Sequence, residues 1–253
     1  MSTETQYQKY RALFAVLALA LTGYFAARNV ATWPGRLRYP GELDVVEGRA
    51  LVDMIDLREG VPIYAPATAE RYNSAEYGPL FYLVGARLVD PARPGFLMLR
   101  LLSTLGTLGL AAGCALLAWR LARSYFAAVL AALLFLAYAP VTNYGVALHP
   151  DTIALLFWYA GFLTAHRFAK DARVLFAALF MMVAFFYKGQ YVSSRLAILL
   201  FLLLEKRFRL AAAFSAILGL AGLAVFFVFR LYRYGVTRGG LWSGSTSQRC
   251  RPL

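Results

Sequence analysis

The sequence has few of the residues that keep soluble domains in water or cross-link small folds. Only 15% of its 253 residues are charged, and it contains two cysteines. Soluble proteins carry about 25% charged residues. Cys114 lies in an apolar run and Cys250 in the polar C-terminal region, without a spacing that suits a disulfide framework or a zinc site. The composition argues against a soluble enzyme and against a small secreted scaffold.

Acidic residues are also scarce. The chain has 13 Asp and Glu against 26 Lys and Arg, which gives a net charge of +13. In a soluble protein this excess of positive charge would suggest nucleic-acid binding. Because 60% of the residues are hydrophobic, we expect instead that the positive charge marks cytoplasmic loops beside anionic lipid. The sequence therefore predicts a membrane protein with no nucleic-acid partner.

Long apolar runs are abundant. A transmembrane helix needs about 20 apolar residues, and the first run has no convincing signal-peptide cleavage site, so we expect it to be retained. The runs predict an all-α, polytopic membrane bundle of about seven transmembrane helices. A tight turn at Gly189 is expected between two short, tilted helices. The expected spans are about 12–32, 96–119, 125–142, 152–168, 174–187, 191–204 and 210–231.

The orientation depends on residues 79–90, which are too short to span and are interrupted by Arg87. We expect this segment to be interfacial or re-entrant. The cationic short loops then all fall on one side, as the positive-inside rule requires. This predicts a multi-pass protein of the cell inner membrane, with a cytoplasmic N-terminus and residues 33–95 as one long external loop. The cytoplasmic cations are Lys9, Arg11, Arg120, Arg123, Arg167, Lys170, Arg173, Lys206, Arg207 and Arg209.

The expected external loop holds most of the acidic residues. The apolar residues of 43–58 have helical spacing, which predicts an amphipathic helix on the outer membrane surface. Carboxylates at such a boundary can act as a general base or bind a divalent metal ion, although a solvated loop charge is the commoner role of any single acid. Asp44 and Glu47 both stay open as the base. The nine acids are Glu42, Asp44, Glu47, Asp53, Asp56, Glu59, Glu70, Glu76 and Asp90.

Two ionisable residues lie at the next external turn, in the sequence HPD. Asp151 opens a predicted helix, where it could serve simply as the N-cap. His149 could be a ligand, a proton carrier or an interfacial residue. The predicted topology places both on the same side of the membrane as Asp44, which favours a shared site.

Two cations complete the set of candidates. Lys188 stands where a predicted span leaves the membrane on the same side as Asp44, although a lysine there can simply extend to the interface. Arg100 lies four residues into a span, where a charge is unfavourable unless it is paired. Both positions are therefore candidates for contact with an anionic group.

The order of these pieces resembles the GT-C superfamily of membrane glycosyltransferases. The nearest resemblance is to bacterial dolichyl-phosphate-mannose-type and aminoarabinose-type transferases, over roughly residues 10–230. It implies transfer of a sugar from a polyprenyl-phosphate donor to a hydroxyl of a glycan, lipid or protein on the periplasmic or external side. The resemblance rests on the order of these pieces along the chain and on the side of the membrane on which each is expected. The pieces are GELDVVEG, REGVPIY, EYGPLFYLV, FLMLRLLSTL, LHPDTIALLFW and FFYKGQY.

The resemblance also implies roles for the catalytic acids. The acid of the first external loop corresponds to Asp44 and would be the catalytic base, with Glu47 as the alternative. The acid of the second external loop corresponds to Asp151 and would assist at the acceptor or at a metal. No cofactor is assigned with certainty, and a divalent metal ion is the one that this resemblance allows.

The remaining roles concern the two substrates. By the same resemblance, Lys188 and Arg100 would hold the phosphate of the lipid donor, since cations stabilise a leaving phosphate. His149 and Tyr77, the latter from the Tyr-x-Pro-Leu sequence, would lie on the acceptor side.

The expected domain organisation is a GT-C-like membrane module over 1–234 and a disordered tail over 235–253. Superfamily members are usually longer, so a truncated or non-catalytic membrane subunit is one alternative. A lipid or solute transporter is another. Transporters often place ionisable groups near the membrane midplane and show inverted repeats. Neither feature is visible here, because the acids gather in one external loop.

Overall fold

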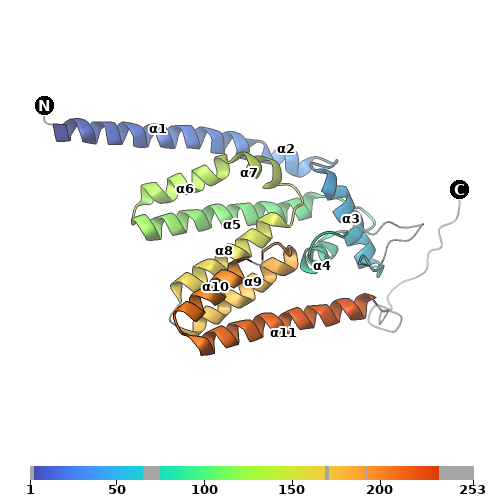
Figure 1. Ribbon diagram of the computed structural model, residues 1–253. Helices are drawn as coiled ribbons and strands as arrows, with labels where there is room; N and C mark the ends of the chain where they lie inside the picture. Colours follow the sequence, from blue (N-terminus) through green and yellow to red (C-terminus); the bar gives the residue numbers. More distant parts are fainter. Residues whose placement is uncertain (1–2, 65–74, 169–170, 192, 234–253) are drawn as a thin grey trace.

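The computed structural model describes residues 3–64, 75–168, 171–191 and 193–233 (Figure 1). Within these residues the chain is entirely helical, which confirms the all-α prediction. The predicted tail, 235–253, lies outside the described residues. The α-helices are α1 Thr3–Ala31, α2 Trp33–Arg38, α3 Val45–Arg58, α4 Pro79–Leu88, α5 Leu97–Ala122, α6 Tyr125–Ala137, α7 Ala139–Tyr144, α8 Asp151–Arg167, α9 Leu175–Tyr187, α10 Ser193–Leu204 and α11 Phe208–Arg233. A short 3₁₀ helix, Ala172–Val174, precedes α9.

Two stretches of the described chain are long and apolar enough to cross a membrane, namely Gln6–Arg38 and Leu97–Ala122. Large apolar side chains stay exposed on the first of them, including Phe14 at 69% and Leu21 at 61%. Apolar surface of this kind is typical of contact with lipid or another protein. The other apolar helices are 10–17 residues long, so the predicted number of seven spans stays a prediction.

The expected span 125–142 is interrupted. Helix α6 ends at Ala137, Tyr138 is extended, and α7 begins at Ala139. Pro140 has no N–H to donate to the carbonyl of Leu136, four residues earlier. The Asn29 side chain of α1 donates to that carbonyl instead, at 2.9 Å. The single long helix predicted here was therefore wrong, and the break turns the chain toward the segment that carries His149.

Helices α5 and α8 approach closely through a row of glycines. Gly106, Gly109 and Gly113 share one face of α5, and a Cβ atom at Gly106 would lie 2.9 Å from Ile153 of α8. At Gly113 it would lie 2.7 Å from the Tyr159 ring, whose hydroxyl donates to the Gly113 carbonyl at 2.9 Å. Small residues allow this close helix packing. This packing places the first turn of α8 beside Gly106, in the third turn of α5.

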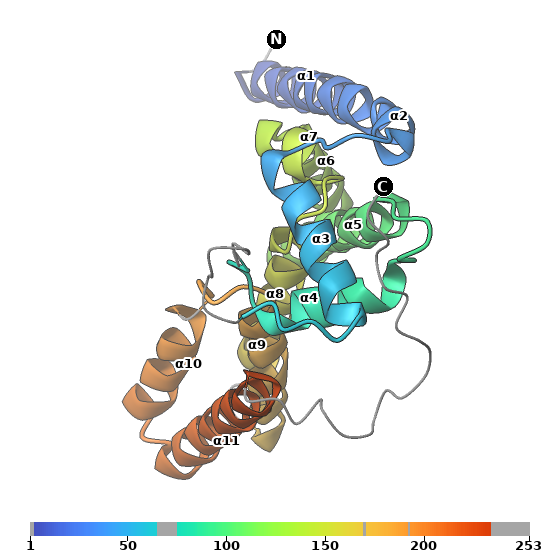
Figure 2. The same ribbon diagram turned by 90° about the vertical axis from the view of Figure 1, so that its right-hand side faces the viewer.

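Helices α3 and α4 pack against each other on the side of the molecule that faces the viewer in Figure 2. The predicted amphipathic helix over 43–58 is confirmed as a helix, with Met54 fully buried and Val52 exposed. Met54 lies against Gly85 of α4, where a Cβ atom would lie 2.2 Å from its sulfur. With ten residues, α4 is about 15 Å long. It is too short to cross a bilayer, in line with the prediction for residues 79–90.

Candidate functional site

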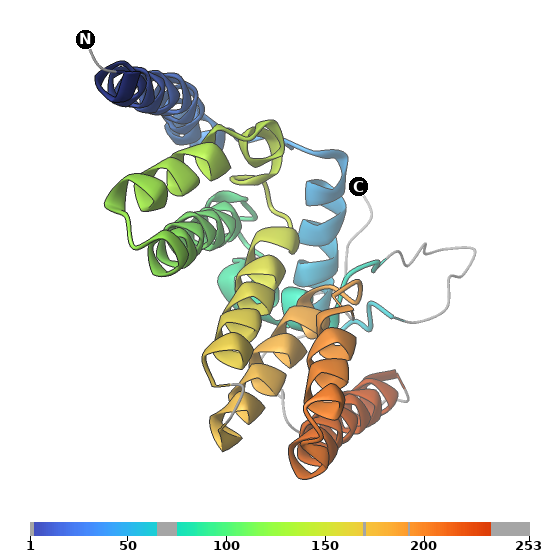
Figure 3. The same ribbon diagram turned by 60° about the vertical axis from the view of Figure 1, so that its left-hand side comes forward.

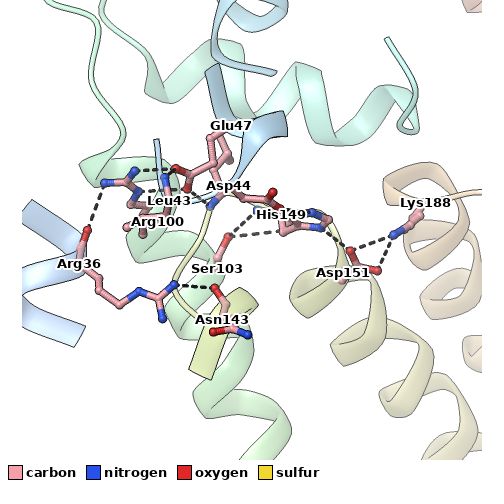
Figure 4. Close-up of polar contacts among 11 residues, drawn as sticks. Arg36, Leu43, Asp44, Glu47, Arg100, Ser103, Asn143, His149, Asp151 and Lys188 are labelled. Carbon is pink, nitrogen blue, oxygen red and sulfur yellow. Dashed lines mark hydrogen bonds and ion pairs between the residues drawn. The ribbon is translucent and has the colours of Figure 1, made fainter. Parts of the chain in front are cut away.

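Two ionic groups lie side by side at the end of the molecule where α3, α5 and α8 begin (Figure 4). The first, called the buried pair below, consists of Glu47 and Arg100. The second, called the open chain, runs from Asp44 through His149 and Asp151 to Lys188.

The buried pair is completely shielded from solvent. Arg100 binds Glu47 through two parallel contacts, from Nη2 to Oε2 at 2.6 Å and from Nε to Oε1 at 3.1 Å. Both side chains are 0% exposed. Two parallel donors are the strong geometry for an arginine–carboxylate contact. This pair therefore ties the start of α3 to the start of α5.

Arg100 has no donor left for a ligand. A guanidinium has five N–H groups, and two of them meet Glu47. The other three donate to backbone carbonyls: Nη1 to Arg36 at 3.1 Å and to Tyr39 at 2.5 Å, and Nη2 to Gly41 at 2.6 Å. The expectation that Arg100 binds the donor phosphate does not fit this geometry, because every N–H already has a protein acceptor.

The carboxylate oxygens of Glu47 are likewise fully occupied by hydrogen bonds within the protein. Besides Arg100, its carboxylate accepts the backbone N–H groups of Leu43 and Leu148, each at 2.6 Å. Burial alone would raise the pKa of Glu47. The hydrogen bonds from Arg100, Leu43 and Leu148 outweigh burial and hold the pKa below its usual value. A fully buried carboxylate with a lowered pKa and both oxygens occupied by protein donors is badly placed to take a proton from an acceptor, so Glu47 does not fit the role of the base.

The open chain joins residues from three separate segments. Asp44 Oδ2 lies 3.3 Å from His149 Nε2, and His149 Nδ1 contacts Asp151 Oδ2. Lys188 Nζ donates to both oxygens of Asp151, at 2.7 and 2.9 Å. Unlike the buried pair, these side chains reach solvent, with exposed fractions between 13% at His149 and 34% at Asp151. They are therefore accessible from solvent.

Neither acid of the open chain is used as a helix cap. Asp44 stands at the N-cap of α3, yet its side chain accepts no capping hydrogen bond within the described chain. Glu47 instead reaches back to the Leu43 N–H, much like the glutamate of a capping box. For α8 the N-cap is Pro150, and Asp151 is the first helical residue. The simple N-cap interpretation of Asp151 was therefore wrong, although its charge still suits the helix dipole.

Asp151 is held in its ionised form. Burial alone would raise its pKa, but hydrogen bonds from His149 and Lys188 outweigh burial and lower it. His149 can donate to both neighbouring carboxylates only when both ring nitrogens carry protons, because a neutral imidazole has one donor and one acceptor. The ring lies between Asp44 and Asp151, and its tautomer decides which of the two carboxylates accepts its N–H.

Tyr77 packs against two members of the open chain, His149 and Lys188. Its ring lies 5.7 Å from the His149 ring, and Lys188 Nζ lies 5.7 Å from its centre. Gly78 fixes this position, since its N–H donates to the Tyr187 carbonyl at 3.1 Å. A Cβ atom at Gly78 would lie 2.1 Å from the Phe186 carbonyl oxygen. Glycine is therefore required where this loop meets the end of α9.

Three residues of the site were missed in the sequence. Tyr144 packs edge-on against His149 at 5.4 Å, and Ser103 Oγ lies 3.4 Å from the His149 carbonyl oxygen. Tyr191 forms a hydrogen bond with Asp151, and burial followed by the Asp151 charge raises the pKa of Tyr191 to about 12. Ser103 and Tyr191 had a sequence signal, because they lie in the pieces FLMLRLLSTL and FFYKGQY, which already contained Arg100 and Lys188. Tyr144 lies in none of the quoted pieces.

The structure thus brings five of the predicted site residues together: Asp44, Tyr77, His149, Asp151 and Lys188. It assigns the other two predicted residues, Glu47 and Arg100, to the adjacent buried pair. Among the described residues, no group of three or more His, Cys, Asp or Glu side chains is placed to hold a metal ion.

Comparisons of the chain with models of protein families, with curated protein sequences and with solved structures found no match.

Proposed function

We propose that this chain is an integral membrane glycosyltransferase. It would move a sugar from a polyprenyl-phosphate donor to an acceptor hydroxyl on the periplasmic or external side of the inner membrane. The observation that carries this proposal is the open chain, which holds a solvent-accessible carboxylate, a histidine and a lysine next to one another. These are the groups that a base and a phosphate site require.

In the proposed reaction, Asp44 is the catalytic base. One of its oxygens faces His149, which leaves the other for the acceptor hydroxyl. The acceptor oxygen forms a bond to the anomeric carbon as the bond from that carbon to the phosphate oxygen breaks. The acceptor proton moves to the Asp44 carboxylate, and the polyprenyl phosphate leaves with the electron pair of the broken bond.

Lys188 would stabilise the leaving phosphate. Its ammonium group has three donors, and two of them meet Asp151 within the described chain. The third can meet a phosphate oxygen. Asp151 and Tyr77 hold the ammonium group in place. Its charge therefore faces the position where negative charge develops, without a large reorganisation of the site.

The membrane part of the proposal is a multi-pass bundle with a cytoplasmic N-terminus. The two long apolar stretches and their exposed apolar side chains support insertion into a bilayer. The sidedness rests on the cationic loops, which leave the start of α3, the start of α8 and the end of α9 on the external side. These are the positions from which the open chain is built.

The test is transfer from a labelled polyprenyl-phosphate sugar by the purified chain, reconstituted with membrane extracts that contain acceptors. We expect Asp44→Asn to lower the rate by about 10²–10⁴, as is typical for loss of a general base. Glu42→Gln is the matched control, because Glu42 is an exposed acid two residues away, and it should leave the rate unchanged. An unmodified chain that releases no more polyprenyl phosphate than Asp44→Asn would contradict the proposal.

A further inference from the structure

With Arg100 committed to the buried pair, the proposed phosphate site contains a single cation, Lys188. A second arginine, Arg195, follows the C-terminal end of α9, as Lys188 does. Unlike Arg100, it does not have a protein acceptor for every donor within the described chain. In Arg195, the Nε and Nη2 atoms are buried and have no hydrogen-bond partner among the described residues. Buried donors without an acceptor are unfavourable and rare in native proteins. The positions of these two atoms therefore call for an explanation.

The two nitrogens form a specific edge of the guanidinium group. Nε and Nη2 donate side by side, and this is the edge with which Arg100 holds the two oxygens of Glu47. In Arg100 the edge meets a carboxylate, whereas in Arg195 no protein acceptor meets it within the described chain. Two parallel donors suit carboxylate and phosphate oxygens equally well. The comparison indicates that an anion is the missing partner of Arg195.

The position of Arg195 connects it to the open chain. Its guanidinium carbon lies 4.0 Å from the centre of the Phe185 ring, and Phe185 is three residues before Lys188 in the last turn of α9. Tyr191, in the connection that leads from Lys188 to α10, bonds to Asp151. Helices α8 and α9 pack against each other, and in Figure 3 this connection, drawn in orange, lies at the same end of that pair as the first turn of α8. Arg195 and Lys188 therefore belong to one region.

The surface of α10 suits a ligand with a long apolar part. Leu196, Leu200 and Leu203 are exposed at 62%, 57% and 42%. Their spacing of four and three residues places them on one face of the helix. This apolar face begins one residue after Arg195. An amphiphile with an anionic head and an isoprenoid chain would match the guanidinium at one end and the leucines along the helix.

We propose that Arg195 is the second cation of the phosphate site and binds the phosphate of a polyprenyl-phosphate lipid, together with Lys188. The identity of the lipid rests on the proposed function, whereas the anion site rests on the unpaired edge of Arg195. Arg195 takes the role that the sequence had suggested for Arg100. Stacking on Phe185 positions the guanidinium plane, and the parallel Nε and Nη2 donors face the phosphate oxygens.

The experiment measures binding without turnover. The full chain, in nanodiscs of phosphatidylcholine, is titrated with decaprenyl phosphate, with decaprenol and with inorganic phosphate. We expect Arg195→Met to weaken decaprenyl phosphate binding about tenfold to a hundredfold, which is the range for loss of a charge-assisted contact. Decaprenol should bind equally weakly to both forms. Arg167→Met is the matched control, because Arg167 is an exposed arginine in the last turn of α8, and it should not change the affinity.

Each outcome decides the proposal. Equal affinities of the unmodified chain and Arg195→Met for decaprenyl phosphate would overturn it. Arg195-dependent binding of inorganic phosphate alone, without binding of the lipid, would overturn the assignment to a lipid. If Arg195→Met does not insert, Arg195→Lys keeps the charge but loses the parallel donors, and it should bind the lipid severalfold more weakly. An unchanged affinity in Arg195→Lys would then count against the proposal.

Failure of the proposed function would give a different result. A chain that binds decaprenyl phosphate through Arg195 but transfers no sugar contradicts the glycosyltransferase and leaves the phosphate site in place. A chain that transfers sugar with the same donor affinity in Arg195→Met contradicts only the role of Arg195.

Discussion

Asp44 and Glu47 are three residues apart at the start of α3, yet their surroundings are opposite. Glu47 is fully buried and accepts hydrogen bonds from Arg100, Leu43 and Leu148. Asp44 is 23% exposed and contacts His149 with one oxygen. A carboxylate whose acceptors are all used holds the fold together, whereas one that is only partly satisfied and accessible can act on a substrate. The number of occupied acceptor positions therefore differs sharply between two acids within a single helical turn.

The two arginines show the same contrast. Arg100 uses all five donors on protein acceptors, whereas two buried nitrogens of Arg195 have no partner in the described chain. The sequence could show that an arginine inside an apolar run needs an anionic partner. It could not show which partner it finds, because Glu47 and the carbonyls of Arg36, Tyr39 and Gly41 lie more than 50 positions away.

The largest expected effect is on folding. Arg100→Leu leaves the buried Glu47 without its countercharge, and removal of one partner of a buried pair typically costs ~3–5 kcal/mol. We expect the free energy of unfolding in detergent to fall by about this amount. Asp44→Asn, in the open chain, should change it by less than ~1 kcal/mol, as is typical for partly exposed groups. An Arg100→Leu chain as stable as the unmodified one would remove the distinction between the two groups.

Gly78→Ala should affect the open chain specifically. Its new Cβ atom would overlap the Phe186 carbonyl oxygen at 2.1 Å, so the loop that carries Tyr77 must shift away from Lys188. Overpacking of this kind costs ~1–3 kcal/mol, and we expect a marked loss of sugar transfer with a smaller loss of stability. Gly95→Ala is the control, because a Cβ atom there meets no atom of the described chain within 4 Å. Equal transfer rates for the two variants would show that Gly78 does not position the site.

The smallest effect concerns pH. The pKa of Glu47 is lowered in the folded state from a usual value of 4.5. The unfolded chain therefore binds the proton more tightly, and Glu47 stabilises the fold fully above pH 4.5. This contribution is lost as the pH falls from 4.5 through the lowered native pKa. Unfolding curves of the unmodified chain between pH 6 and about 3 should lose more stability than those of Glu47→Gln. Parallel curves would contradict the assignment.

The sequence predicted the site better than the spans. Asp44, His149, Asp151 and Lys188 were expected to meet because the cationic loops placed their three segments on one side, and they do contact one another. The end of α6 could have been predicted from Pro140, whose missing N–H interrupts a helix. The partner of the freed Leu136 carbonyl could not, since Asn29 lies in a different helix.

Glu47 shows why some roles in the site could not be predicted from the sequence. In the sequence it looks like Asp44: an acid in one cluster, after the same span. The burial of Glu47 depends on which side of α3 faces the core. Its hydrogen bonding depends on two backbone N–H groups, one of them from Leu148, 101 positions away. No local pattern contains that information. The sequence therefore left both acids open as the base, and the buried contact of Glu47 with Arg100 of α5 distinguishes them.

The most direct test of this account measures two quantities on Asp44→Asn and Glu47→Gln in parallel: the rate of sugar transfer from a labelled polyprenyl-phosphate donor, and the melting temperature in the same detergent. We expect Asp44→Asn to keep its melting temperature and to lose about 10²–10⁴ in rate. Glu47→Gln should melt at a markedly lower temperature, and the fraction that stays folded should still transfer sugar. A stable Glu47→Gln chain without activity, beside an active Asp44→Asn chain, would contradict it.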